Sequence, residues 1–199
     1  MKLFHIAGTC SVSPHIALLE AGIPFELCRV DRETKQVKGV GDYNQINTKG
    51  SVPAIQLDDG RVLTEGAAIV QYIADQAPAK NLAPKAGTFE RNQLQEMLNF
   101  IATEIHKGYS PLFNPKLPED VRKGFADRLS SRIGWAAKRL EKHPYLMGDN
   151  FTVADGYFFT VLRWSERTKI DLSQWPSIQA FMTRMSERPA VAAALKADA

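Results

Sequence analysis

The sequence predicts an α/β plus all-α chain, in which a βαβ-ββα unit is followed by helices only. Three observations lead to this prediction. Short apolar runs and one helical pattern alternate over residues 1–75. A stretch with Pro, Asn and Gly follows at residues 76–87 and is typical of a linker. Beyond it, apolar residues recur at helical spacing and no strand pattern is found.

The chain begins with the pattern of a βαβ unit. Residues 2–7 predict a strand, and residues 11–21 predict a helix that tolerates Pro14 in its first turn. Gly22 marks the end of this helix, and residues 25–30 predict a second strand. Two strands joined by a helix are expected to lie parallel.

The next part reads as two antiparallel strands and a helix. Residues 31–49 are polar and predict a long loop with room for one helical turn. A third strand is expected at residues 52–57, and the Asp-Asp-Gly sequence at 58–60 is a hairpin signal. Residues 61–63 predict a short fourth strand, and residues 64–75 predict a helix.

We therefore divide the chain into a domain at residues 1–78, a linker at 79–86 and an all-helical domain at 87–199. Thr152 and Asp155 form a capping box, which satisfies the N–H groups at a helix start and is structural. The helices expected in the second domain begin at residues 88, 118, 151 and 175, and a short Ala-rich helix closes the chain.

Composition narrows the classes of function. The net charge is +3, but the basic residues form no long run, so nucleic acid is not expected as a partner. The two cysteines, Cys10 and Cys28, do not suggest a disulfide framework. No signal-peptide pattern and no apolar run of about 18 residues is found, so we expect a cytoplasmic protein without a membrane span.

Cys10 lies in the turn between the first strand and the first helix. Near a helix N-terminus, free N–H groups and the helix dipole favour a thiolate or a bound ligand thiolate. A small buried cysteine with a structural role fits the same local pattern. The spacing alone leaves both interpretations open.

A second group of polar residues lies on the first helix of the second domain. Asn99, Thr103 and His106 are spaced i, i+4 and i+7, which places them on one face of an α-helix, and Lys107 follows directly. An imidazole there would face a cleft between the domains and could exchange protons with a thiol. The alternative is a solvated face that carries an ordinary surface histidine.

Two further features point to ligand binding. A cis Pro53 would leave the N–H and C=O of Val52 free to pair with an extended peptide, whereas a simple edge-strand proline is the plainer interpretation. At Glu65 and Gly66 a helix begins, and its first N–H groups can hold a carboxylate while Glu65 holds an amine. The plainer interpretation here is a Glu that only complements the helix dipole.

With these pieces in place, the chain resembles a cytosolic glutathione S-transferase and is most similar to the bacterial beta class. The resemblance covers essentially the whole length and implies a thioredoxin-like N-terminal domain, an all-helical C-terminal domain and a homodimer. It rests on Cys10 after the first strand, Ser51–Ile55, Leu63–Glu65 at a helix start, Asn99–Lys107, and Gly148-Asp149 with Phe151–Asp155.

The resemblance also implies a role for each site residue, with glutathione as a co-substrate and with no metal and no cofactor. Cys10 and Ser11 would lie at the glutathione sulfur, and Lys35 would bind the glycyl carboxylate. Val52, beside Pro53, would pair with the cysteinyl unit. Glu65 and Gly66 would hold the γ-glutamyl end. The remaining contacts implied are Asn99, Thr103, His106 and Lys107, some of them across a dimer.

One position departs from the family pattern. The family usually has Ser where this chain has Gly66, so the backbone N–H is retained and the hydroxyl donor is lost. A hydrogen bond to a charged group is worth about 1.5–3 kcal/mol, which would weaken glutathione binding by about tenfold or more unless water replaces it.

The chemistry implied is conjugation of the glutathione thiol to a hydrophobic electrophile, in an apolar pocket with Tyr109, Phe113 and Trp164 as candidate walls. With Cys10 at the sulfur, glutathione-dependent thiol–disulfide exchange is a competing chemistry, and it would be monothiol because position 13 is Ser. A non-catalytic ligand-binding or protein-interaction module of the same fold is the alternative function.

Overall fold

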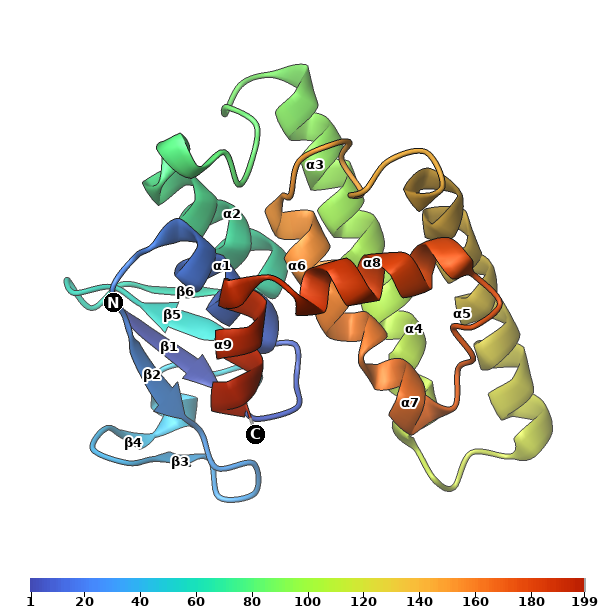
Figure 1. Ribbon diagram of the computed structural model, residues 1–199. Coiled ribbons are helices and arrows are strands. Elements are labelled where there is room, and N and C mark those ends of the chain that lie inside the picture. The colour runs from blue at the N-terminus through green and yellow to red at the C-terminus, as the bar shows by residue number, and fades with distance from the viewer. Residues whose placement is uncertain (199) are drawn as a thin grey trace.

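The computed structural model describes residues 1–198 and shows two domains side by side (Figure 1). The N-terminal domain is built on a four-stranded sheet of order β2-β1-β5-β6. β1 (Lys2–His5) lies parallel to β2 (Glu26–Arg29) and antiparallel to β5 (Ala54–Gln56). β5 pairs antiparallel with β6 (Val62–Thr64), as the hairpin signal predicts.

Two helices of this domain pack against each other and against the sheet. They are α1 (Val12–Ala21) and α2 (Gly66–Gln76). α1 ends at Gly22, whose φ of +68° lies in the left-handed region and whose N–H donates to the carbonyl of Leu19. The parallel β1-α1-β2 unit and the antiparallel β5-β6 pair confirm the predicted βαβ-ββα fold class.

The long loop at residues 31–49 holds a small hairpin that the sequence did not reveal. β3 (Gln36–Val37) pairs with β4 (Gly41–Asp42), and the expected helical turn follows as a 3₁₀ turn at Tyr43–Gln45. Val37 and Tyr43 are buried in a second small core against Phe4. Strands of two residues show no alternation, so periodicity could not predict them.

The second domain is helical throughout the part that the structure describes. Its central helix is α6, whose ten residues are all buried, as expected for a helix that is apolar on every side. The elements after the linker's 3₁₀ turn at Pro78–Lys80 are α3 (Phe89–Phe100), a π-helix (Ile101–His106), α4 (Lys107–Tyr109), a 3₁₀ turn (Ser110–Phe113), α5 (Glu119–Leu140), α6 (Val153–Leu162), α7 (Trp164–Thr168), α8 (Pro176–Ser186) and α9 (Pro189–Asp198).

The predicted helix at residues 88–108 differs from the structure in one respect. Residues 101–106 form a π-helix, whose i→i+5 hydrogen bonds widen the turn. The assumption that Asn99, Thr103 and His106 share one α-helical face is therefore wrong. The extra residue in the turn rotates His106 relative to Asn99, and periodicity in the sequence carries no signal for it.

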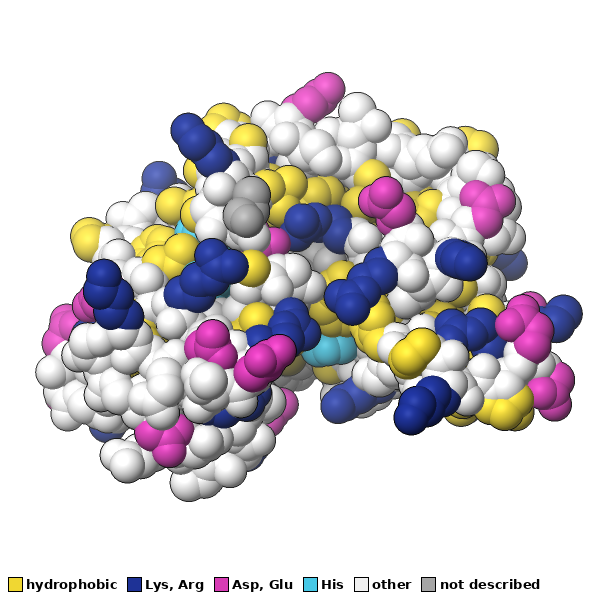
Figure 2. Space-filling model, turned by 90° about the horizontal axis from the view of Figure 1, so that it is seen from below, with side chains coloured by type: hydrophobic (Ala, Val, Ile, Leu, Met, Phe, Trp, Pro, Cys, Tyr) yellow, Lys and Arg dark blue, Asp and Glu magenta, His cyan; other side chains and the backbone are white. Residues whose placement is uncertain are grey.

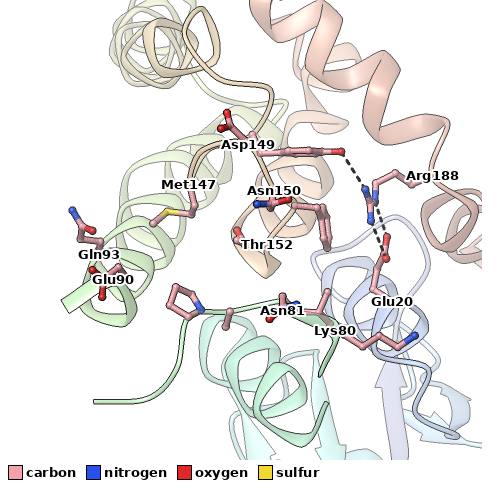
Figure 3. Close-up of a pocket in the computed structure, with 15 residues that line it drawn as sticks. Glu20, Lys80, Asn81, Glu90, Gln93, Met147, Asp149, Asn150, Thr152 and Arg188 are labelled. Atoms are coloured by element: carbon pink, nitrogen blue, oxygen red, sulfur yellow. Dashed lines mark hydrogen bonds and ion pairs between the residues drawn. The ribbon is translucent and has the colours of Figure 1, made fainter. Parts of the chain in front are cut away.

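The two domains meet at an ion pair beside the linker. Glu20 at the end of α1 accepts from Arg188, which lies between α8 and α9, with N···O distances of 2.7 and 3.0 Å. The guanidinium lies 4.1 Å from the ring centre of Phe151 and also donates to the hydroxyl of Tyr145. Figure 3 shows this group on the wall of a cavity of about 930 Å³. None of the predicted site residues lines that cavity.

α9 then returns to the N-terminal domain and packs against α1 (Figure 1). The last described helix therefore belongs to the helical region in sequence but contacts the first domain in space.

Replacing Asp155 with Ala is expected to lower the free energy of unfolding by about 2–4 kcal/mol. The buried carboxylate accepts from the N–H of Leu146 at 2.7 Å, and from the N–H and hydroxyl of Thr152 at 2.8 and 3.0 Å. Burial raises the pKa of Asp155 to about 6, so urea unfolding is measured at pH 7.5, where the carboxylate is ionised. Asp149→Ala is the control, because that side chain is 83% exposed. Equal losses in the two variants would contradict this role.

Candidate active site

The turn that carries Cys10 is fixed by a cluster of short hydrogen bonds. The hydroxyl of Thr9 donates to the carbonyl of Ile6 at 2.7 Å, and the Oγ of Ser11 accepts from the N–H of Ile6 at 3.2 Å. Ser11 is fully buried and bonds to Thr9 as well. Its hydroxyl therefore lies inside the turn, which does not support the predicted contact between Ser11 and a ligand.

The Cys10 side chain is a thiol at neutral pH. Burial raises its pKa to about 11, and nearby Glu65 adds to this effect, while a backbone hydrogen bond and the charge of Lys107 oppose it. The Sγ donates to the carbonyl of Val52 at 3.4 Å. Desolvation of the sulfur opposes a thiolate on Cys10 itself, whereas a thiolate carried by a bound ligand near the start of α1 stays a prediction.

The segment before β5 presents a free backbone group. The Val52–Pro53 bond is cis, as the resemblance implies. The carbonyl of Ser51 accepts from the hydroxyl of Tyr43 at 2.7 Å and from the amide of Asn47 at 2.6 Å. The N–H of Val52 has no partner within residues 1–198. Tyr43 and Asn47 are therefore supports of this segment that the sequence analysis missed.

The start of α2 offers both a carboxylate and free N–H groups. Glu65 precedes the helix with a φ of +70°, and the N–H groups of Gly66 and Ala67 have no partner among the described residues. The carboxylate of Glu65 pairs with the ammonium of Lys49 at 2.6 Å, and Lys49 also donates to Thr64. Because both members are more than half exposed, a ligand amine can compete with Lys49 for Glu65.

Lys35 lies at the turn that leads into β3. Its backbone has a φ of +58°, and its carbonyl accepts from the N–H of Tyr43 at 2.9 Å. The structure records no contact between its side chain and Cys10 or Glu65. Its predicted role with a carboxylate is therefore carried by the resemblance alone.

His106 faces an aromatic cluster at the domain junction. Its Nδ1 lies 2.6 Å from the hydroxyl of Tyr157, and its ring lies 5.0 Å from the ring of Trp164. Burial lowers the pKa of His106 to about 4; Lys107 adds to this effect, and Glu65 opposes it. The imidazole is therefore neutral at pH 7. Asn99 and Thr103 are exposed, and the hydroxyl of Thr103 donates to the carbonyl of Asn99 rather than facing His106.

The three predicted pocket residues meet around one ring. Tyr109 and Phe113 pack edge-on against Trp164, with ring centres 5.8 and 5.6 Å away. Tyr109 is fully buried and its hydroxyl bonds to Ser165, so it lies behind the other two. Phe113 and Trp164 are partly exposed and offer an apolar surface.

Trp164 and Asp198 hold the Cys10 turn from the helical side. The indole N–H of Trp164 donates to the carbonyl of Gly8 at 3.1 Å. The carboxylate of Asp198 accepts from the N–H of Gly8 at 3.0 Å and pairs with Arg163 at 3.4 Å. The sequence analysis missed Asp198, because an acidic residue near a chain end gives no local signal.

These residues act on one another electrostatically at the junction of the two domains. The charges of Glu65 and Lys107 shift the pKa values of both Cys10 and His106. Cys10 and Glu65 in turn raise the pKa of Tyr157, in addition to the effect of burial. Seen from below, Lys and Arg side chains gather at the junction of the two domains, where a histidine is visible (Figure 2). Within residues 1–198 there is no group of His, Cys, Asp or Glu that could hold a metal, and no helix suited to cross a membrane.

Alkylation of Cys10 by iodoacetamide is expected to accelerate about tenfold per pH unit from pH 7 to 9.5, without a plateau. The reason is that the thiolate fraction grows in this way below a pKa of about 11. Peptide mass spectrometry separates Cys10 from the buried Cys28, and free glutathione is the reference thiol. A plateau at Cys10 below pH 8 would show that the site holds a thiolate.

Known proteins match this chain along its length. The glutathione S-transferase N-terminal domain model matches residues 8–76, and the C-terminal domain model of the same family matches residues 100–189. Glutathione S-transferase GstA of Escherichia coli O157:H7 is 44% identical over 198 residues, which cover 100% of this chain and 98% of the relative.

Solved structures agree with these matches. The ternary complex of BphK, a bacterial GST, has a TM-score of 0.96 and 54% identity, covering 100% of this chain and 99% of that one. The bacterial beta class glutathione S-transferase of Sphingomonas chungbukensis has a TM-score of 0.94 and 41% identity, covering 100% and 98%. The predicted resemblance, the thioredoxin-like N-terminal domain and the helical C-terminal domain are confirmed, and the chain belongs to the glutathione S-transferase family.

Proposed function

We propose that this protein is a glutathione transferase that conjugates the thiol of glutathione to hydrophobic electrophiles. The observation that carries the proposal is that Glu65 and Lys107 lie within electrostatic range of both Cys10 and His106, while free N–H groups begin α2 directly after Glu65. The family membership supports glutathione as the co-substrate.

Each end of glutathione has a group that fits it chemically. The free N–H of Val52 suits the backbone of the cysteinyl unit, as an added strand would. The γ-glutamyl amine would replace Lys49 at Glu65, and the γ-glutamyl carboxylate would accept from the N–H of Gly66. Lys35 remains the candidate for the glycyl carboxylate, as the resemblance implies.

The protonation states in the cleft favour conjugation. The Cys10 thiol would turn its S–H from the carbonyl of Val52 to the sulfur of glutathione and so stabilise the glutathione thiolate, while Lys107 supplies positive charge nearby. The thiol proton of glutathione passes to solvent, and the thiolate then attacks an electrophile held against the apolar surface of Phe113 and Trp164. The carbon–sulfur bond forms as the leaving group departs with its electron pair.

Thiol–disulfide exchange through Cys10 is less favoured. It requires the Cys10 thiolate as the nucleophile, and burial keeps that sulfur protonated. A non-catalytic binding module is the alternative, but it would not need Cys10 and His106 to lie within electrostatic range of the same two charges, at Glu65 and Lys107. The proposal also includes a homodimer. The large exposed side chain of Phe89, with 71% of its surface accessible, supports an interface, and light scattering can test it. A cytoplasmic detoxification role is the last part of the proposal.

Replacing Cys10 with Ala is expected to keep about a tenth of kcat/KM for conjugation of chlorodinitrobenzene, because one hydrogen bond to a charged sulfur is lost. Any glutathione-dependent reduction of a small disulfide should disappear in the same variant. Cys28→Ala is the matched control and should change neither rate.

Equal loss of both activities in the Cys10 variant would contradict the separate roles. If the wild-type protein neither binds immobilised glutathione nor turns over chlorodinitrobenzene, the binding-module alternative replaces the transferase.

Replacing Gly66 with Ser is expected to tighten glutathione binding about threefold to tenfold, because the new hydroxyl can donate to the γ-glutamyl carboxylate. The backbone accepts a side chain here, since an added Cβ would lie 3.9 Å from Pro53 and Gly66 has no left-handed φ. Titration calorimetry measures the Kd, and Gly66→Ala adds the Cβ without the hydroxyl. If the Ala variant binds as tightly as the Ser variant, helix stability and not the hydroxyl is responsible.

A further inference from the structure

The side chain of Tyr157 has an unexpected position for a residue of the core helix. It is 3% exposed, yet its hydroxyl points to the imidazole of His106 at the domain junction. The two rings are nearly perpendicular, at 88°, with the Tyr157 hydroxyl 2.6 Å from the Nδ1 of His106. This contact joins α6 to the end of the π-helix.

The direction of this hydrogen bond follows from the partners available. Within residues 1–198 the hydroxyl of Tyr157 has no other hydrogen-bond partner than His106. If Nδ1 were the donor, the phenolic proton would be buried without an acceptor, which costs about 1–3 kcal/mol. The hydroxyl therefore donates to Nδ1. Burial also raises the pKa of Tyr157, so the phenol keeps its proton.

The other ring nitrogen is then fixed as well. A neutral imidazole carries one proton, and when Nδ1 accepts, that proton is on Nε2. Nε2 has no partner within residues 1–198, and it is not among the buried polar atoms that lack one, so solvent reaches it.

We propose that Tyr157 is a positioning residue that locks His106 in the Nε2–H tautomer, so that His106 presents a hydrogen-bond donor, and not a base, to the glutathione sulfur in the cleft. The donor part of this inference rests on the proposed function. The tautomer part rests only on the contacts of the protein itself.

This assignment changes what His106 can do. A base would remove the thiol proton of glutathione and become a buried cation beside Lys107, which the low pKa of the ring opposes. A donor stays neutral and stabilises negative charge on sulfur without accepting a proton. His106 and the Cys10 thiol would then act in the same way, as neutral donors to one thiolate.

The test measures the tautomer directly. In ¹⁵N-labelled protein at pH 7.5, NMR is expected to show His106 with an unprotonated Nδ1 and a protonated Nε2, with the signals assigned by their loss in His106→Gln. Tyr157→Phe should give a mixture of both tautomers. Tyr109→Phe is the matched control, because it removes another buried tyrosine hydroxyl, bonded at 2.5 Å to Ser165, without touching His106.

Urea unfolding of the two Phe variants separates loss of stability from loss of the tautomer. A protonated Nδ1 in the wild-type protein, or an unchanged single tautomer in Tyr157→Phe, would overturn the lock. A mixture in Tyr109→Phe would also overturn it, since the tautomer would then depend on general packing.

Glutathione titration tests the donor role. The Nε2 signal of His106 is expected to shift on saturation, and Tyr157→Phe should lower kcat about threefold to tenfold with little change in KM, since the lost interaction acts on the developing thiolate. Binding seen at Val52 and Glu65 without a shift at Nε2 would overturn the donor role. Absence of all glutathione binding would instead overturn the proposed function. The tautomer measured in the unliganded protein would still decide whether Tyr157 locks His106.

Discussion

Burial of α6 on every side is the constraint on which the domain junction and the cleft both depend. Its first turn is closed by Asp155, which satisfies three donors that would otherwise be buried without partners. α1 packs against this part of α6, where Ile16 lies next to Gly156. The next residue, Tyr157, bonds to His106. The first turn of α6 thus closes its own N-terminus, packs against the N-terminal domain and contacts the candidate active site.

Burial of Cys10 and His106 in turn determines the chemistry at the domain junction. Desolvation penalises charge, so it protonates Cys10 and deprotonates the ring of His106, and both are neutral at pH 7. In the proposed mechanism, Cys10 and His106 would be two neutral donors to a bound thiolate, and Lys107 acts electrostatically on both residues. Neutral donors that are already in place stabilise an anion without a buried cation beside it. A buried cation and anion would both have to lose their water, and this cost can exceed their mutual attraction.

Local signals in the sequence predicted the fold well. Gly22, the Asp-Gly hairpin and the Thr152–Asp155 box each act within a few residues, so pattern and position were enough. The site was predicted less completely. The π-helix turns His106 to another side of the helix, although the apolar periodicity of the sequence does not change. Ser11 points into the turn because its hydroxyl accepts from the backbone N–H of Ile6. The partners that complete the site, Lys49, Tyr157 and Asp198, are distant in sequence from the residues they contact.

The Cys10 turn shows why the site belongs to both domains. The Gly8 residue next to it is bonded through its N–H to Asp198 and through its carbonyl to Trp164, both from the helical region. The internal hydrogen bonds of Thr9 and Ser11 set the shape of the turn, but these two contacts set its position relative to His106. Because Trp164 also packs on His106 and Phe113, one side chain places the thiol turn, the imidazole and the apolar surface with respect to one another. In the proposed function, the N-terminal domain would supply most of the binding groups for glutathione, and the helical domain would fix where its sulfur meets an electrophile.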